Sequence, residues 1–288
     1  MEGRQLWTAF FEAVGLPTDH RLESREQMEE LIRRTLGRYL YSNIEILSLT
    51  NPEARLFPVE PFAAFAYLEQ TRYGFCFQVL EVVFQVLREK GVACSRHVAL
   101  PVNLPCDDNL PDDAILLARP HSHEVIVVRI QNEDYLLDVG YGPGSLQGLL
   151  PLKQLNRELH LGDSTYRLTA LQSDSKWRRL DLQMPDDSWR SLYIWTTDLL
   201  PDADVERLNR DLYDKSLVPL GVRDSYLYFA SCFPERKSAK LFVDEPNYVL
   251  TRRANGELKE ERTLTDALFM ETDFGIPRQT RVDKIFRK

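Results

Sequence analysis

The chain of 288 residues is poor in cysteine and has no long apolar run. Its four cysteines show neither CxxC spacing nor the density of a secreted disulfide scaffold, so a reducing compartment is expected. No apolar stretch approaches the roughly 20 residues of a membrane helix, and the N-terminal segment lacks the continuous apolar core of a signal peptide. We therefore expect a cytoplasmic protein that is not a membrane protein.

Basic runs are also missing, and the charge balance is acidic. The 36 Lys and Arg residues against 44 Asp and Glu residues give a formal net charge of −8. Nucleic acids and anionic membranes attract basic surfaces, so neither is expected as a partner, and a small molecule is favoured. The length and a hydrophobic content of 43% suit one large domain or two to three small ones.

The hydrophobic period changes along the chain. Helical spacing and stop signals predict helices at residues 6–14, 24–39, 60–70 and 77–91, with Ser24 and Gln27 spaced for a capping box. Strand patterns follow at 92–100, 124–130, 135–139, 164–170, 177–183 and 189–195, and a surface loop is expected over much of 103–120. The last third predicts a helix at 202–213, a helix-like segment at 225–230, strands near 241 and at 248–252, a turn at 255–256 and a helix around 265–271. An α+β fold with a central sheet or small barrel is predicted.

Cys76 lies in the stretch from Arg72 to Gln78, where a glycine-containing turn runs into an amphipathic helix. The N-terminus of a helix carries a partial positive charge and free N–H groups, which favour thiolate over thiol and lower the cysteine pKa. A lone free cysteine is, however, more often a buried structural residue. Cys76 is therefore a candidate nucleophile that needs partners elsewhere in the chain.

His123 begins an apolar strand and Asp138 ends another, with a polar stretch between them that predicts a hairpin. In a Cys-His-Asp enzyme the imidazole takes the thiol proton and the carboxylate orients the ring. A turn centred between Asn132 and Glu133 places His123 and Asp138 on the same face but about 13 Å apart along the strands. In that register a bulge or bend is required to bring them together. A sheet-edge cap and a turn residue are the ordinary structural explanations for the two.

Other histidines compete for the role of base. His121 shares the face of His123 if the strand extends backward, whereas His97 lies in a strand pattern and His20 and His160 in polar loops. A zinc site from His121, His123 and Cys106 has no second cysteine or HExxH helix to support it, so no metal is expected.

Together these segments resemble the arylamine N-acetyltransferases. The signature of that family is an Arg-Gly-Gly-aromatic-Cys segment opening a helix, a His heading a strand, and an Asp-(Val/Ala)-Gly-aromatic-Gly stretch fifteen residues after the His. Here the segment from Arg72 to Cys76, His123, and the stretch from Asp138 to Gly142 match, and 138 − 123 gives 15. This spacing selects His123 over His121.

The resemblance implies an N-terminal helical bundle at 1–91, a central β-barrel at 92–200 and a C-terminal α/β lid at 201–288, around a cysteine-protease-like core. It makes Cys76 the acetyl acceptor, His123 the base and Asp138 its orienter, with Phe75 and Tyr141 lining the acceptor pocket. Acetyl-coenzyme A is then the donor, and an arylamine, hydrazine or N-hydroxyarylamine the acceptor, in a ping-pong cycle of xenobiotic metabolism. A monomer or weak homo-oligomer is expected.

Arg72 matches the arginine of the signature and is expected to form a structural ion pair, with Glu45 as a candidate mate. The chain departs from the family at Tyr73, which replaces the first glycine and removes a free choice of φ, and at Leu80, where asparagine is frequent. The customary Pro-Phe-Glu-Asn segment is not recognisable near Asn43. These departures bear on the range of acceptors.

Three other functions fit the same residues. An amide synthase or acyltransferase would use a larger acyl donor. A cysteine hydrolase or transglutaminase-like enzyme shares the Cys-His-Asp layout and differs in what deacylates the enzyme. A non-catalytic scaffold would keep only the fold. No residue set defines a coenzyme A pocket, and the basic tail at 278–288 is a phosphate contact or a solvated terminus.

Overall fold

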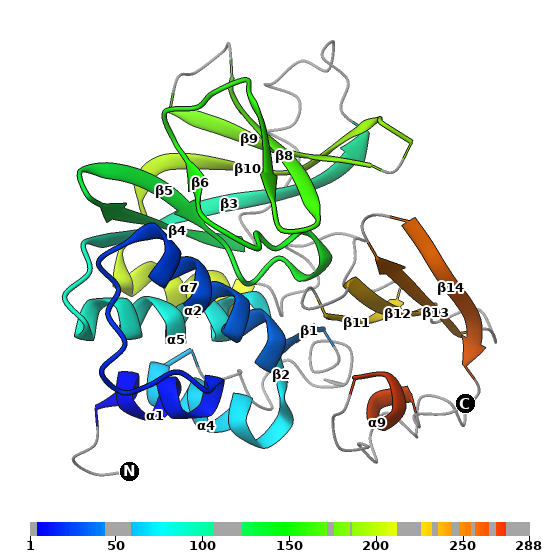
Figure 1. Ribbon diagram of the computed structural model, residues 1–288, viewed down its shortest axis with the longest axis horizontal. Helices are drawn as coiled ribbons and strands as arrows, with labels where there is room; N and C mark the ends of the chain where they lie inside the picture. Colours follow the sequence, from blue (N-terminus) through cyan, green and yellow to red (C-terminus); the bar gives the residue numbers. More distant parts are fainter. Residues whose placement is uncertain are drawn as a thin grey trace.

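The computed structural model describes residues 5–43, 59–105, 123–171, 176–184, 186–211, 226–231, 236–242, 248–254, 257–264 and 269–274. Its elements form a group of N-terminal helices, a barrel-like sheet and a second sheet near the C-terminus (Figure 1). The predicted α+β fold is confirmed. No helix among these residues is long and apolar enough to cross a membrane.

The N-terminal helices are α1 (Leu6–Val14), α2 (Arg25–Arg38), α4 (Pro61–Thr71) and α5 (Cys76–Glu89). The predicted capping box starts α2: the Ser24 hydroxyl accepts from the Gln27 N–H at 3.4 Å, and the Gln27 side chain accepts from the Ser24 N–H at 3.1 Å. Gly15 follows α1 in the left-handed conformation at φ 74°. The buried faces of these helices share one apolar core with one face of the larger sheet.

The larger sheet has eight strands in the order β6-β5-β4-β3-β10-β9-β8-β7 and curls into a nearly closed barrel (Figure 1). Its strands are β3 (Cys94–Pro105), β4 (His123–Ile130), β5 (Glu133–Leu137), β6 (Leu150–Pro151), β7 (Glu158–Leu161), β8 (Ser164–Ala170), β9 (Trp177–Gln183) and β10 (Trp189–Leu199). Strand alternation divides β4: Val125 faces the barrel interior, whereas Ile126 and Val128 face the helices. Helix α5 packs against β3 and β4 on that outer face.

The smaller sheet has six strands in the order β14-β13-β12-β11-β1-β2. Its strands are β1 (Leu40–Ser42), β2 (Tyr73–Gly74), β11 (Tyr226–Ser231), β12 (Arg236–Phe242), β13 (Tyr248–Ala254) and β14 (Glu257–Leu264). Two of them come from the N-terminal part: β1 pairs with β2 in parallel and with β11 antiparallel. The remaining elements are the 3₁₀ turn η1 (Gly142–Gly144) and helices α7 (Asp202–Asp211) and α9 (Phe269–Phe274).

Several predictions of secondary structure differ from the structure. The helix-like segment at 225–230 is wrong, because β11 pairs on both sides, with β12 and β1. The expected loop does not start at 103, because β3 continues to Pro105, and residues 106–120 lie outside the described residues. Strands β1, β2, β6, β7 and β14 were not expected, and strands as short as β1 and β2 carry no readable period. The turn at 255–256 and the start of the last predicted helix lie outside the described residues.

Candidate active site

The approach to Cys76 is a tight passage from strand to helix. Gly74 ends β2, where a Cβ would come within 2.5 Å of a methyl group of Leu68, so no larger residue fits without movement. Phe75 then adopts extended backbone at φ −90° and ψ 167°, and its N–H donates to the Gln78 side chain at 2.8 Å. Cys76 is consequently the first residue of α5, as the sequence predicts.

The segment before this passage differs from expectation at two residues. Arg72, not Tyr73, adopts the left-handed conformation, at φ 64°, and Tyr73 is a fully buried residue of β2. Tyr73 therefore needs no special backbone freedom, and the loss of φ choice that accompanies tyrosine at this position causes no strain. Arg72 pairs with Glu69 at 3.2 Å. The candidate mate Glu45 lies outside the described residues.

The electrostatic environment of Cys76 opposes ionisation. Burial raises the pKa of the thiol, which is only 2% exposed, well above its ordinary value, and ionisation of Glu124 or Asp138 raises it further. The backbone N–H groups of Phe77 and Cys76 lower the pKa, which is the expected effect of the helix N-terminus. The net direction is upward, so the predicted lowering of the thiol pKa is wrong for this structure.

The hairpin between β4 and β5 has a tighter turn than the sequence predicts. Gln131 and Asn132 both have positive φ, 51° and 66°, as a two-residue type I′ turn requires. Ile126 therefore pairs with Leu137, and Val127 with Leu136 rather than with Asp138. This register halves the expected offset between His123 and Asp138 from four residues to two.

Asp138 lies just beyond the end of β5 and turns toward His123. His123 Nε2 and Asp138 Oδ2 are 2.9 Å apart, with both residues essentially inaccessible to solvent, at 2% and 0% exposure. The predicted separation of about 13 Å is therefore wrong, because the turn is shorter and the ladder ends before Asp138. A pairing through Nε2 leaves Nδ1 as the ring nitrogen available for proton exchange with a reacting group.

Gly140 links this pair to Cys76. The other carboxylate oxygen of Asp138 accepts a hydrogen bond from the Gly140 N–H at 2.9 Å. A Cβ on Gly140 would lie 3.2 Å from the Cα of Cys76 and 2.6 Å from a methyl group of Leu80, so the loop and the start of α5 are in close contact. The structure thus brings the three candidate residues into one buried region where α5, β4 and the loop after β5 meet.

Aromatic rings surround the imidazole. His123 contacts Tyr141 and Tyr193, with ring centroids 5.0 and 5.4 Å away, and the Tyr141 hydroxyl donates to the Leu192 carbonyl at 2.5 Å. Burial, and then the charge of Asp138, raises the pKa of Tyr193 well above its usual range. Of the two expected pocket residues, Tyr141 adjoins His123, and Phe75 packs on Tyr41 at a centroid distance of 5.6 Å. Both are half-buried.

The competing histidines that the structure describes are engaged elsewhere. His97 bonds to Ser95 at 2.8 Å and the Asp198 carbonyl at 3.0 Å, and His160 bonds to Thr165 at 2.8 Å. His121 and Cys106 lie outside the described residues. Within the described ranges no group of three His, Cys, Asp or Glu side chains is arranged to hold a metal ion.

Sequence reasoning missed an ionisable group beside this site. Glu124, next to His123, is completely buried on the face of β4 that packs against α5. The signal was present in the strand pattern, because alternation places Glu124 with Ile126 and Val128 on the helix-facing side.

Comparisons with known proteins agree with this architecture. The N-acetyltransferase family model matches residues 26–280. The structure is similar to arylamine N-acetyltransferases from Mycobacterium marinum (TM-score 0.78, 19% identity, 97% of this chain and 98% of that one) and Salmonella typhimurium (TM-score 0.78, 16% identity, 99% and 98%).

The M. marinum enzyme in complex with CoA is also similar, with a TM-score of 0.76 and 19% identity over 97% of this chain and 98% of that one. At these identities the similar structures support the fold alone. A search of curated proteins finds no match to the sequence. Because the family model spans most of the sequence, the chain belongs to the arylamine N-acetyltransferase family of acyltransferase enzymes.

Proposed function

We propose that Cys76, His123 and Asp138 form a catalytic triad that transfers an acetyl group from acetyl-coenzyme A to an arylamine, hydrazine or N-hydroxyarylamine. The 2.9 Å pairing of His123 with Asp138 carries this proposal, since it fixes the ring in a buried site adjoining Cys76 through Gly140. The CoA complex of a similar M. marinum enzyme supports a coenzyme A thioester as donor. We also propose a cytoplasmic location and a monomer or weak homo-oligomer. The proposed domains are residues 1–91, 92–200 and 201–288.

The raised thiol pKa makes a base necessary in the first half-reaction. His123 takes the proton of Cys76 while the sulfur attacks the acetyl carbonyl carbon. The tetrahedral intermediate then collapses, the carbon–sulfur bond to coenzyme A breaks, and the imidazolium returns its proton to the departing thiolate. Asp138 keeps the ring oriented and stabilises the transient imidazolium.

In the second half-reaction the amine nitrogen attacks the Cys76 thioester. His123 accepts a proton from the nitrogen, and the amide leaves as the carbon–sulfur bond to Cys76 breaks and the thiol is reprotonated. Phe75 and Tyr141 line the acceptor side in this proposal. Their half-buried rings offer an apolar surface for an aromatic acceptor.

Intact-protein mass spectrometry tests the proposal. Mixing the protein with acetyl-coenzyme A should add one acetyl group, and an arylhydrazine should then remove it. The adduct should be absent in Cys76→Ala and His123→Gln but present in the matched controls Cys94→Ala and His121→Gln. If no short acyl-coenzyme A leaves an adduct, the proposal is wrong, and rapid loss of the adduct without an acceptor would indicate a hydrolase.

A further inference from the structure

Glu124 is an unusual residue for its position. It directly follows His123 in β4, and its side chain faces α5 rather than the barrel interior. The residue has 0% exposure, and no N–H or O–H donor of the described residues reaches either carboxyl oxygen. A buried carboxylate with no donor is strongly unfavourable, so the geometry favours a neutral carboxyl group.

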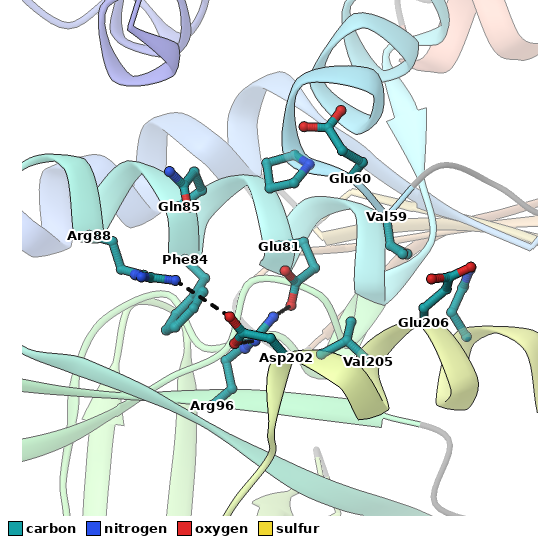
Figure 2. Close-up of a pocket in the computed structure, with 12 residues that line it drawn as sticks. Val59, Glu60, Glu81, Phe84, Gln85, Arg88, Arg96, Asp202, Val205 and Glu206 are labelled. Atoms are coloured by element: carbon teal, nitrogen blue, oxygen red, sulfur yellow. Dashed lines mark hydrogen bonds and ion pairs between the residues drawn. The ribbon is translucent and has the colours of Figure 1, made fainter.

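The nearest cation is already engaged. Arg96 of β3 is on the same face as Glu124, since Val98 pairs with Glu124 and alternate residues share a face. Its guanidinium binds Glu81 of α5 and Asp202 at the start of α7, and it lies 4.4 Å above the ring of Phe84. Figure 2 shows these side chains converging at a cavity of about 540 Å³. Arg96 thus neutralises Glu81 rather than Glu124.

Glu81 is the group that Glu124 faces across the contact between α5 and β4. Burial raises the pKa of both carboxyl groups, and for Glu81 it outweighs the opposing effects of Arg96 and of a hydrogen bond with Glu124. Burial, and then the charge of Glu81 and the same hydrogen bond, raise the pKa of Glu124 well above its usual range. Two ionised carboxylates cannot hydrogen-bond to each other, and Arg96 stabilises the charge of Glu81 whereas no donor reaches Glu124, so Glu124 is the donor and Glu81 the acceptor.

We propose that Glu124 is a positioning residue that keeps its carboxyl proton at neutral pH and donates it to the Glu81 carboxylate, which ties β4 to α5 behind Cys76. The charged and titratable groups that face Glu124 are Glu81 and Cys76 from α5, Arg96 from β3, and Asp138 from the loop after β5. The bond adds no second negative charge beside the thiol.

The consequence for catalysis rests on the proposed function of Cys76. An ionised Glu124 raises the pKa of the thiol, second only to burial in its effect. A neutral Glu124 removes this repulsion while the hydrogen bond still fixes the strand that carries His123. Glu124 therefore acts through the groups that react, without touching the substrate.

Infrared spectroscopy of the full chain tests the protonation state directly. At pH 7 the wild-type protein should show the C=O stretch of a buried protonated carboxyl group, and Glu124→Gln should lack it. Glu206→Gln is the matched control, because Glu206 is an exposed carboxyl at the same cavity, and it should keep the band. Absence of the band in the wild type, or its survival in Glu124→Gln, would overturn the proposal. If the variant fails to fold, the wild-type spectrum alone still tests the proposal.

Alkylation of Cys76 gives a second readout that needs no acetyl-coenzyme A. The rate with iodoacetamide, followed at the Cys76 peptide between pH 6 and 9, should agree within about twofold at pH 7 between wild type and Glu124→Gln, since glutamine replaces one neutral donor by another. An increase of about tenfold, which corresponds to a thiol pKa lower by one unit, would show that Glu124 is ionised and refute the proposal. Neither the infrared band nor the alkylation rate depends on acetyl transfer. If acetyl transfer fails while both measurements give the expected results, the proposed function is wrong and the role of Glu124 stands.

Discussion

Gly140 sets the distance between the loop after β5 and the start of α5, and an added methyl group should disturb it. Its φ is not positive, so alanine is conformationally allowed and the effect of Gly140→Ala is one of space. The new Cβ would lie 2.6 Å from Cδ1 and 2.9 Å from Cγ of Leu80, and 3.2 Å from the Cα of Cys76. Carbon atoms in ordinary contact are about 3.5–4.0 Å apart, so the loop and α5 must separate by roughly 1 Å.

Two magnitudes follow from that separation. Overpacking of a buried site costs about 1–3 kcal/mol, and Leu80 is fully buried, so the free energy of unfolding should fall by that amount. A misplacement of about 1 Å at a nucleophile costs on the order of 100-fold in rate. Acetylation of Cys76 should therefore slow by about 10- to 100-fold in Gly140→Ala, measured by rapid-quench mass spectrometry alongside urea unfolding.

A double-mutant cycle with Leu80→Ala separates the two contacts. Leu80→Ala alone should cost about 2–5 kcal/mol, but in that background Gly140→Ala should cost less, with a coupling of about 0.5–3 kcal/mol. The acetylation rate should recover only in part, because the contact with the Cys76 backbone remains. Equal costs in both backgrounds would refute the Leu80 contact as the cause.

Gly91→Ala is the matched control. Gly91 has open space around its Cβ position but a φ of 73°, so alanine there should destabilise the fold through strain and leave acetylation unchanged. Normal acetylation in Gly140→Ala would mean that Gly140 does not position Cys76.

Two further predictions concern the carboxyl groups. Asp138→Asn should keep the fold but slow acetylation of Cys76 by about 10⁴-fold, because an amide neither sets the His123 tautomer nor stabilises imidazolium; single-turnover kinetics measure this. Burial raises the folded-state pKa of Glu124 well above its ordinary value of 4.5, so its contribution to stability is fully present below about pH 4.5 and is lost as the pH rises toward the folded-state pKa. Urea unfolding from pH 4 to 9 should show wild type losing stability relative to Glu124→Gln; a constant difference would contradict the raised pKa.

Much of the fold was predictable because its signals are local. The capping box at Ser24 and the helical period after Cys76 are encoded within a few residues, and the structure has α2 and α5 where they predict helices. The hairpin register was not predictable from pattern alone. The deciding feature is positive φ at Gln131 as well as Asn132, and glutamine has no particular preference for that conformation.

The predicted lowering of the Cys76 pKa is wrong because residues distant in the sequence act on the thiol. The helix N-terminus does lower the Cys76 pKa, but burial of the thiol by surrounding elements outweighs it. The sequence contains Glu124 in an apolar strand, and strand alternation places it against a helix. Only the packing of β4 on α5 reveals that the residue it faces is Glu81 and that Arg96 is already paired.

The position of Cys76 also depends on strands far away in the sequence. The two residues of β2 lead into the helix, and they pair with β1, whose Tyr41 is opposite Ala230 in β11. The ring of Tyr41 packs against the tilted ring of Phe75 and also against Gly142. Gly142 has a φ of 65°, and a Cβ on it would lie 3.1 Å from the Tyr41 ring. The ring thus holds the residue before the nucleophile against the loop that follows Asp138. Substitutions in β11 that shift Tyr41 should therefore displace the Cys76 thiol and the His123–Asp138 pair together, because the Tyr41 side chain contacts the segments that position both.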